Sequence, residues 1–356
     1  MSTIPEMSGP YVRKEKSVTR TMTLVMLALM PATAYGLYLY GWPAVILFTV
    51  TIASALLFEV LSLVVARKPV ATFVSDGSAV LTAWLLAISL PPWAPWWIAV
   101  VGSAVAIVIG KQVFGGLGQN VFNPAMVGRV VLLISFPLEM TSFVQPQPLL
   151  TTGSPDFAQS LQVIFGGQPI DAYTSATVLD SVKTAVGQGG SVQDGLSDRL
   201  AIGSWIAGTN AGSMAEGADV LLLLGGIALV LTRVIRWFIP VSTLLSLAAI
   251  STIFNLIDPT TYADAGVHLF TGTAVLGAFY IATDPVTSPT SPKGQIFFGA
   301  SLGILVYVIR TWAQYPEGMS FAILLMNAVT PLINRYMRPR IFGRTARGDP
   351  LTRTPG

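Results

Sequence analysis

Long apolar runs, separated by short polar breaks, fill most of this chain, and one polar interval (138–217) divides them into two groups. A membrane-spanning helix needs about 20 mostly apolar residues. Before the interval, the candidate spans are Thr21–Tyr40, Ala44–Ala66, Ala79–Leu90, Trp93–Val113 and Met126–Phe136. After it, they are Val220–Phe238, Val241–Leu256, Val267–Thr283, Ile296–Thr311 and Ser320–Tyr336. The pattern predicts an all-α polytopic membrane protein with about ten transmembrane helices and a polar extramembrane loop.

The composition agrees with a membrane protein, because 53% of the 356 residues are hydrophobic and only 10% are charged. Soluble domains carry about a quarter charged residues. The net charge of +3 does not indicate nucleic-acid binding, since the basic residues sit at helix ends and in the tails. The first apolar run lacks a small-residue cleavage site, so we expect a helix there rather than a signal peptide.

Positive charges predict the orientation, because Lys and Arg concentrate in cytoplasmic loops. Ten crossings from a cytoplasmic N-terminus place the basic breaks, Lys111 among them, and the Arg-rich C-terminal tail inside the cell, with Arg310 as the main exception. The mostly acidic interval then lies outside. We divide the chain into a cytoplasmic segment (1–20), a first transmembrane repeat (21–137), a periplasmic loop (138–217), a second transmembrane repeat (218–337) and a basic cytoplasmic tail (338–356).

The two halves also resemble each other. Asp76–Pro92 and His268–Pro289 are both rich in small residues and end in prolines, and Lys111–Gly118 and Lys293–Gly303 follow at matching places. Paired segments interrupted by Gly and Pro are typical of duplicated transport folds. We therefore predict two five-helix repeats with broken helices near the middle of the membrane.

The chain contains no cysteine and a single histidine, His268. This excludes structural disulfides, cysteine-ligated iron–sulfur clusters, the usual Cys/His zinc sites and haem held by two histidines. If the protein transfers electrons, an organic cofactor has to carry them. His268 begins a predicted helix, so we expect it at the membrane interface.

The stretch DAYTSATVLD (Asp171–Asp180) concentrates hydroxyl and carboxyl groups inside the polar interval. Thr177, with Asp180 three residues later, has the spacing of a helix N-cap, and on the residues alone this interpretation is favoured. The alternative is that the Thr177 hydroxyl is esterified to a phosphate, since its small neighbours Ser175 and Ala176 let a modifying enzyme approach.

The same stretch resembles the flavinylation motif Asp-x-x-(Ser/Thr)-(Gly/Ser)-Ala-Thr of membrane subunits in the Rnf/Rsx and Nqr ion-pumping oxidoreductases. The blocks DGSAVLTAWLLAISLPP, FGGLGQNVFNPAMVGR, IATDPVTSPTSPKGQIFFG and YPEGMSFAILLMNAVTPLINRY also resemble, in order, the NqrB/RnfD family. The resemblance implies FMN attached through its phosphate to Thr177, and its attachment motif comprises Asp171, Thr174, Ser175 and Ala176. Ser175 stands where the family often has glycine, and Asn334 stands where relatives often carry an acid.

This resemblance further implies a bacterial inner-membrane subunit of a complex that transfers electrons between ferredoxin and NAD while it moves Na⁺ or H⁺. It implies partner subunits with iron–sulfur clusters and flavin, and a second, non-covalent flavin (riboflavin) in this chain. A threonine hydroxyl needs external activation to accept a phosphoryl group, which points to a separate flavin transferase.

The stretch FGGLGQNVFNPA (Phe114–Ala125) offers candidate contacts for the non-covalent flavin. Gly115, Gly116 and Gly118 permit positive-φ backbone beside a ligand. Asn120 and Asn123 offer donors and acceptors for the pyrimidine edge of a flavin. The alternative is a glycine-rich break whose asparagines satisfy freed backbone groups, and spacing alone favours it.

Ionisable residues at membrane depth are costly, so they are candidates for an ion path. Glu59 lies in the middle of an apolar run, and Asp76 and Asp284 lie at helix ends beside broken segments. For Asp76 and Asp284 a capping role is an equal alternative.

Two other functions fit the same pattern. A cofactor-free secondary transporter or channel would explain the duplicated, proline-broken helices, and a structural protein that scaffolds redox partners would carry no flavin. Flavin fluorescence that survives denaturing electrophoresis would separate a covalent flavoprotein from both.

Overall fold

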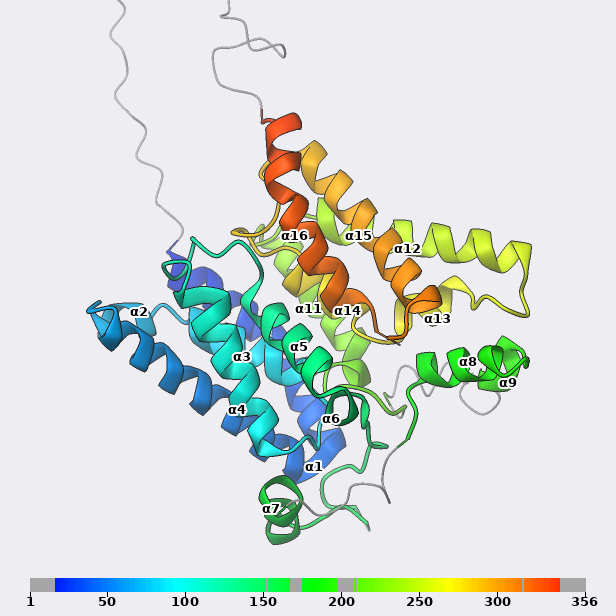
Figure 1. Ribbon diagram of the computed structural model, residues 1–356, viewed down its shortest axis with the longest axis horizontal. Coiled ribbons are helices and arrows are strands. Elements are labelled where there is room, and N and C mark those ends of the chain that lie inside the picture. The colour runs from blue at the N-terminus through cyan, green and yellow to red at the C-terminus, as the bar shows by residue number, and fades with distance from the viewer. Residues whose placement is uncertain are drawn as a thin grey trace, which may run out of the picture.

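The computed structural model describes residues 17–151, 153–166, 175–196, 208, 210–315 and 317–339, and the regular elements in this part are all helices (Figure 1). The first half contains α1 (Val18–Val65), α2 (Val70–Val74), α3 (Ser78–Ser89), α4 (Trp96–Ala104), the π-helix η1 (Val105–Gln112) and α5 (Pro124–Ser135). The polar interval contributes α6 (Pro137–Thr141), α7 (Phe157–Phe165), α8 (Val178–Gly187) and α9 (Val192–Leu196). The second half contains η3 (Glu216–Ala218), α11 (Asp219–Leu231), α12 (Phe238–Ile257), α13 (Ala265–Phe270), α14 (Ala274–Leu276), the π-helix η4 (Gly277–Ile281), α15 (Pro292–Trp312) and α16 (Met319–Tyr336).

α1 joins the first two predicted helices into one element with a kink. Gly41 is its non-helical residue, with φ 73° and ψ −164°, a conformation that glycine adopts without steric cost. Pro43 follows and lacks the amide hydrogen of a regular turn. Figure 1 shows two limbs that diverge from the kink. Thr21–Tyr40 and Ala44–Ala66 are therefore two limbs, as predicted, but no loop separates them.

The predicted helix Val267–Thr283 is interrupted. α13 ends at Phe270, Gly272 adopts φ 70°, and the helix resumes at Ala274 before it widens into η4. In the first half, the π-helix η1 similarly continues α4. The predicted span Val267–Thr283 is thus broken at Gly272, in the segment predicted to be interrupted, and a position near the middle of the membrane stays a prediction.

Three helices, α1, α12 and α15, are long and apolar enough to cross a membrane. α3, α4 with η1, and α5 are apolar but shorter. Large apolar side chains such as Leu57, Leu245 and Leu256 are more than half exposed, which suits lipid rather than water. The chain is thus a polytopic integral membrane protein; its ten crossings and its two repeats stay predictions.

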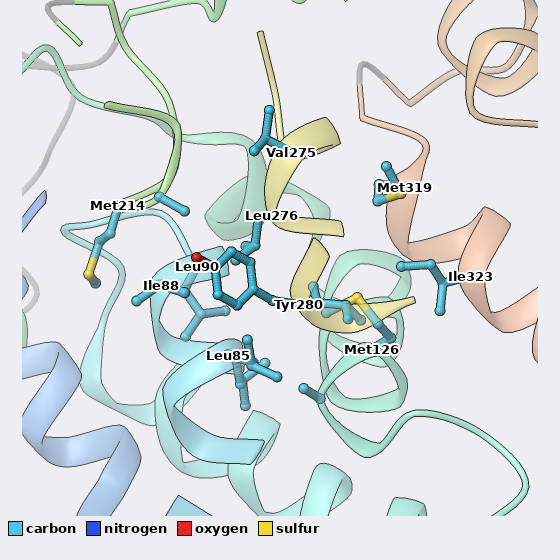
Figure 2. Close-up of a cluster of buried hydrophobic side chains, with 14 of the residues drawn as sticks. Leu85, Ile88, Leu90, Met126, Met214, Val275, Leu276, Tyr280, Met319 and Ile323 are labelled. Carbon is cyan, nitrogen blue, oxygen red and sulfur yellow. The ribbon is translucent and has the colours of Figure 1, made fainter. Parts of the chain in front are cut away.

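The two halves meet in an apolar core. Figure 2 shows the ring of Tyr280 among side chains from both halves, including Leu85 of α3, Met126 of α5 and Leu276 of α14. The Tyr280 hydroxyl donates a hydrogen bond to the carbonyl oxygen of Leu222 in α11 at 2.9 Å. The broken segment α14–η4 is therefore packed against elements of both halves.

The two ends of the helix bundle carry different parts of the chain. In Figure 1 the start of α1 lies at the upper left and the end of α16 at the top, whereas α7 lies at the bottom and α8 and α9 lie at the lower right. The polar interval reaches the kink of α1, where the amide of Leu149 donates to the carbonyl oxygen of Tyr38 at 2.8 Å. We call these two sides the terminal end and the loop end of the bundle.

α12 and α15 form the most extensive helix pair among the described elements, because glycine lets their backbones approach. A Cβ atom at Gly299 of α15 would lie 2.7 Å from the carbonyl oxygen of Ile239. One at Gly303 would meet the carbonyl oxygen of Thr243 and lie 2.9 Å from the amide nitrogen of Leu247. A larger residue at either glycine would force the two helices apart.

We expect Gly303→Leu to push α15 away from α12 and to lower the free energy of unfolding by about 1–3 kcal/mol, the usual cost of overpacking. Thermal unfolding of the purified protein in detergent measures this loss. The control Ile304→Leu, at a 44% exposed position of the same helix, should keep the wild-type unfolding temperature. Equal unfolding temperatures for Gly303→Leu and wild type would contradict the close packing.

Candidate functional site

A cavity of about 360 Å³ lies at the terminal end, between the two halves. Its walls come from α1, α3, η1 and the loop before α5 in the first half, and from η4 and the starts of α12 and α15 in the second. The wall is a mixture of apolar and polar side chains, and the volume is typical of a small-molecule site. The polar residues in the wall include Ser78, Lys111, Asn120, Asn123, Asp284 and Gln295.

Both predicted asparagines, Asn120 and Asn123, line this cavity, but their side chains do different things. Asn123 Oδ1 accepts a hydrogen bond from the Met126 amide at 3.3 Å and so caps α5, whose first residue is Pro124. Asn120 Nδ2 donates to the carbonyl oxygen of Phe122 at 3.1 Å, while its Oδ1 is buried with no partner among the described residues. Because such an acceptor is costly to leave unpaired, Asn120 is the stronger candidate for a ligand contact.

Gln295 also lines the cavity with a buried, unpartnered amide oxygen, and it was not among the predicted site residues. Its Nε2 donates to the carbonyl oxygen of Pro289 at 2.9 Å, and its buried Oε1 has no partner in the described part of the chain. Gln295 lies in the block IATDPVTSPTSPKGQIFFG, but a single polar residue in the first turn of an apolar helix is typical of helix ends and was not singled out.

The three glycines of the predicted flavin contacts shape the loop before α5. Gly115, Gly116 and Gly118 adopt φ values of 115°, 105° and 89°, so the loop uses the positive-φ freedom that was predicted. Their neighbour Leu117 lines the cavity, but the three glycines do not. They present Asn120 to the cavity, and a direct ligand contact of theirs stays a prediction.

A buried ion pair lies beside the cavity. Lys111 Nζ is 2.7 Å from Glu59 Oε1, and the two side chains are 3% and 1% exposed. Lys111 Nζ also donates to Ser78 Oγ at 2.8 Å, and the Ser78 hydroxyl donates to Asp76 Oδ1 at 2.5 Å. The structure therefore joins two predicted ion-path acids, Glu59 and Asp76, in one polar network.

Lys111 lies in the last turn of η1, so its predicted place at a helix end is confirmed, and its cytoplasmic side stays a prediction. Its position in η1 is buried, so its charge requires a nearby partner. The signal that a partner existed was Glu59, an acid in the middle of an apolar run. Asp284, the third predicted acid, lines the cavity and accepts hydrogen bonds from the Val286 amide and the Thr287 hydroxyl at 3.1 and 3.2 Å, within the turn that follows η4 rather than as a helix cap.

At the loop end, Thr177 begins α8. Its Oγ1 accepts a hydrogen bond from the Asp180 amide at 3.2 Å, so the capping interpretation is confirmed. Thr177 is 8% exposed, Ser175 is half-buried and Ala176 is exposed. The other two residues of the attachment motif, Asp171 and Thr174, lie outside the described residues.

A cavity of about 20 Å³ lies beside Thr177, with Glu216, Thr271 and Gly272 in its wall. This volume suits about one water molecule and cannot hold a fused ring system. Burial, and then the neighbouring Glu317 carboxylate, raise the pKa of Glu216. Because this cavity is too small for a ring system, a group attached to Thr177 would extend toward the surface beside the exposed Ala176.

Lys183 fixes α8 to the membrane helices. Its Nζ donates to the carbonyl oxygens of Arg310, Ala313 and Tyr315 at the end of α15, where a cation is favourable to the helix dipole. Burial lowers the pKa of Lys183, and Asp180 opposes that shift. An apolar cluster holds the same unit in place: Val178, Val182, Val192, Leu196, Ala263 and Val267.

Arg310 was the main exception to the charge-based orientation, and it is buried at the loop end. Its Nη2 lies 3.1 Å from Glu317 Oε1, and its guanidinium donates to the carbonyl oxygens of His268 at 2.6 Å and Thr271 at 3.1 Å. Glu317 in turn accepts hydrogen bonds from the amides of Thr273 and Met319, at the starts of α14 and α16. Arg310 and Glu317 thus provide hydrogen-bond partners for backbone carbonyl and amide groups that have no helical partner at the break at Gly272.

His268 is a further correction. It lies in the last turn of α13, is 6% exposed and packs on the Tyr307 ring with the ring centroids 5.0 Å apart. We expected an interfacial histidine at a helix start. The break at Gly272 instead makes this residue the buried end of a short helix.

Fold and cavity together define a polytopic membrane protein with a small-molecule-sized site between its halves. Residues 6–343 match the NQR2, RnfD, RnfE family. The chain is similar to three proteins that are each named as the D component of an ion-translocating oxidoreductase complex. It is 49% identical to that of Halorhodospira halophila over 346 residues, which cover 97% of both chains. It is 49% identical to that of Stutzerimonas stutzeri over 336 residues (94% of this chain, 95% of the relative) and 42% identical to that of Escherichia fergusonii over 348 residues (94% and 97%).

The chain therefore belongs to the NQR2, RnfD, RnfE family, and the family resemblance that the motifs predicted is confirmed.

We expect Arg310→Met to lower the free energy of unfolding by about 3–5 kcal/mol, because it leaves the mostly buried Glu317 without its counterion. Arg310→Lys should recover only part of this loss, since one ammonium group cannot replace the forked guanidinium donors. Thermal unfolding in detergent measures both variants, with the exposed Arg335→Met as the control. Wild-type stability of Arg310→Met would show that the break at Gly272 does not depend on this pair.

Proposed function

We propose that this chain is the flavin-carrying membrane subunit of an Rnf-type complex, which couples electron transfer between ferredoxin and NAD to the movement of Na⁺ or H⁺. Family membership and the names of the relatives support the ion-translocating oxidoreductase complex. The observation that carries the flavin proposal is the Thr177 hydroxyl, which begins α8 inside a motif that resembles the flavinylation sequence. Without cysteine and with one histidine, electron transfer through this chain needs an organic cofactor.

FMN attached through its phosphate suits the surroundings of Thr177. The first amides of a helix have no intrahelical partners and carry partial positive charge, so they stabilise a phosphate on the capping oxygen. The ring system would lie on the surface, because the cavity beside Thr177 is too small for it. Asp171, Thr174, Ser175 and Ala176 would then be read by a separate flavin transferase.

A second, non-covalent flavin, riboflavin, fits the cavity at the terminal end. The volume of about 360 Å³ lies in the range of small-molecule sites, and the apolar part of the wall suits a fused aromatic ring. Asn120 Oδ1 and Gln295 Oε1 are both buried acceptors with no partner among the described residues, and one of them would accept the single imide hydrogen of the flavin. Lys111 adds a cationic donor to the same wall.

The two sites lie at opposite ends of the bundle. α15 runs from Gln295 at the cavity to the contacts with Lys183 beside α8, and its 21 residues correspond to roughly 30 Å. We propose that the terminal end is cytoplasmic and the loop end periplasmic, in a bacterial inner membrane that ten helices cross as two five-helix repeats. Electrons would cross the membrane with the help of partner subunits that carry iron–sulfur clusters and flavin. Glu59, Asp76 and Asp284 are the candidates for an ion path.

Three variants of Thr177 separate flavin attachment from helix capping. Thr177→Ser keeps both a hydroxyl and a cap, so we expect flavin fluorescence to survive denaturing electrophoresis. Thr177→Asp keeps the cap without a hydroxyl, so we expect no fluorescence and wild-type stability. Thr177→Ala should lose both the fluorescence and about 1 kcal/mol of stability.

The proteins for this test come from cells that contain the transferase, and mass spectrometry of the tryptic peptide that ends at Lys183 locates the added group. A non-fluorescent wild-type band would favour the cofactor-free transporter or the structural scaffold. A fluorescent Thr177→Asp band would move the attachment site elsewhere.

A further inference from the structure

Lys111 is the buried charge in the wall of the cavity at the terminal end. Among the described residues of this wall, three are charged: Lys111, Arg236 and Asp284. Arg236 is exposed, and its Nη1 donates to the carbonyl oxygen of Thr290 at 3.3 Å. The Asp284 carboxylate is engaged by its own turn, and only Lys111 of the three is nearly inaccessible to solvent. A charge in a dry wall acts more strongly on a bound molecule than one in water.

The contacts of Lys111 leave one of its donors for an occupant of the cavity. An ammonium group has three N–H donors. Glu59 Oε1 and Ser78 Oγ accept two of them, at 2.7 and 2.8 Å. Lys111 therefore places a cation in the cavity wall, and its third donor has no acceptor among the described residues.

Glu59 reduces the positive electrostatic potential that Lys111 produces in the cavity. Its Oε1 pairs with Lys111, and its Oε2 is buried without a partner in the described part of the chain. The carboxylate thus offsets part of the positive charge that a bound molecule experiences. Lys111 and Glu59 therefore act on the charge of the occupant in opposite directions.

We propose that Lys111 is the residue by which the cavity distinguishes the charge state of its ligand, favouring the reduced, anionic isoalloxazine over the oxidised, neutral one. This inference rests on the proposed non-covalent flavin. Two electrons from a reductant and one proton from water convert the neutral oxidised ring into an anion, and its negative charge lies on the pyrimidine side. An ammonium group beside that side stabilises the anion, so Lys111 raises the reduction potential of the bound flavin and Glu59 lowers it.

The test uses the full chain with Thr177→Asp, which has no hydroxyl for covalent FMN at that position, and riboflavin as the probe. Equilibrium dialysis gives the dissociation constant of oxidised riboflavin in air and of riboflavin reduced with dithionite under anaerobic conditions. In Lys111→Met we expect the preference for the reduced form to fall at least tenfold, about 30 mV for a two-electron couple. Lys293→Met removes an exposed lysine outside the cavity and should leave the preference unchanged.

A double variant distinguishes this role from a purely structural one. Lys111→Met alone leaves Glu59 buried without a counterion and threatens the fold. Lys111→Met with Glu59→Gln leaves no unpaired charge, and we expect its preference for reduced riboflavin to be at least tenfold below that of Glu59→Gln alone. Glu59→Gln alone should increase the preference for reduced riboflavin. If Lys111 were only the structural partner of Glu59, the double variant would keep the preference of Glu59→Gln alone.

The outcomes separate the two proposals. If the parent protein does not bind oxidised riboflavin, the proposed cavity flavin is overturned, and the role of Lys111 is overturned with it. If Glu59→Gln and the double variant both bind oxidised riboflavin and show equal preference for the reduced form, only the role of Lys111 is overturned.

Discussion

A helix that breaks inside lipid is stable only if protein groups replace its missing backbone hydrogen bonds, and this requirement organises the whole bundle. At the loop end, Arg310 binds the carbonyl oxygens of His268 and Thr271, and Glu317 binds the amides that begin α14 and α16. After η4, Asn327 and Thr330 of α16 donate to the carbonyl oxygen of Thr287. These contacts let the segment between α13 and α15 leave helical geometry without exposing its backbone to lipid.

The same irregular segments supply the two candidate sites. The loop before α5 brings Asn120 to the cavity at the terminal end, and Lys111 faces that cavity from the π-helix η1. At the loop end, Thr177 begins a helix that Lys183 fastens to the end of α15. One continuous helix, α15, thus connects the neighbourhoods of both sites and sets their separation at about the thickness of a bilayer. Two flavins held this far apart would suit a protein that passes electrons across a membrane.

Helix positions were predictable from the sequence because burial in lipid requires long apolar runs, and every predicted range contains helix. The cap at Thr177 was also predictable, since it depends on residues three positions apart. A break within His268–Pro289 was predicted, but its position at Gly272 was not, because a glycine is accommodated both in a helix and at positive φ. Lys111 was missed as a partner of Glu59, because the two are 52 positions apart and only the packing of α1 against η1 brings them together. Gln295 became a candidate only when its unpartnered oxygen was found in the cavity wall.

The central claim is that the two candidate flavin sites face opposite sides of the membrane. Because the chain contains no cysteine, single cysteines report their accessibility without background from other thiols. Gln188→Cys lies at the exposed end of α8, and Lys293→Cys lies at the exposed start of α15 near the cavity. A membrane-impermeant maleimide added to intact spheroplasts should label Gln188→Cys alone, and Lys293→Cys should react only after the membrane is permeabilised. Labelling of both cysteines in intact spheroplasts, or of Lys293→Cys alone, would contradict the account.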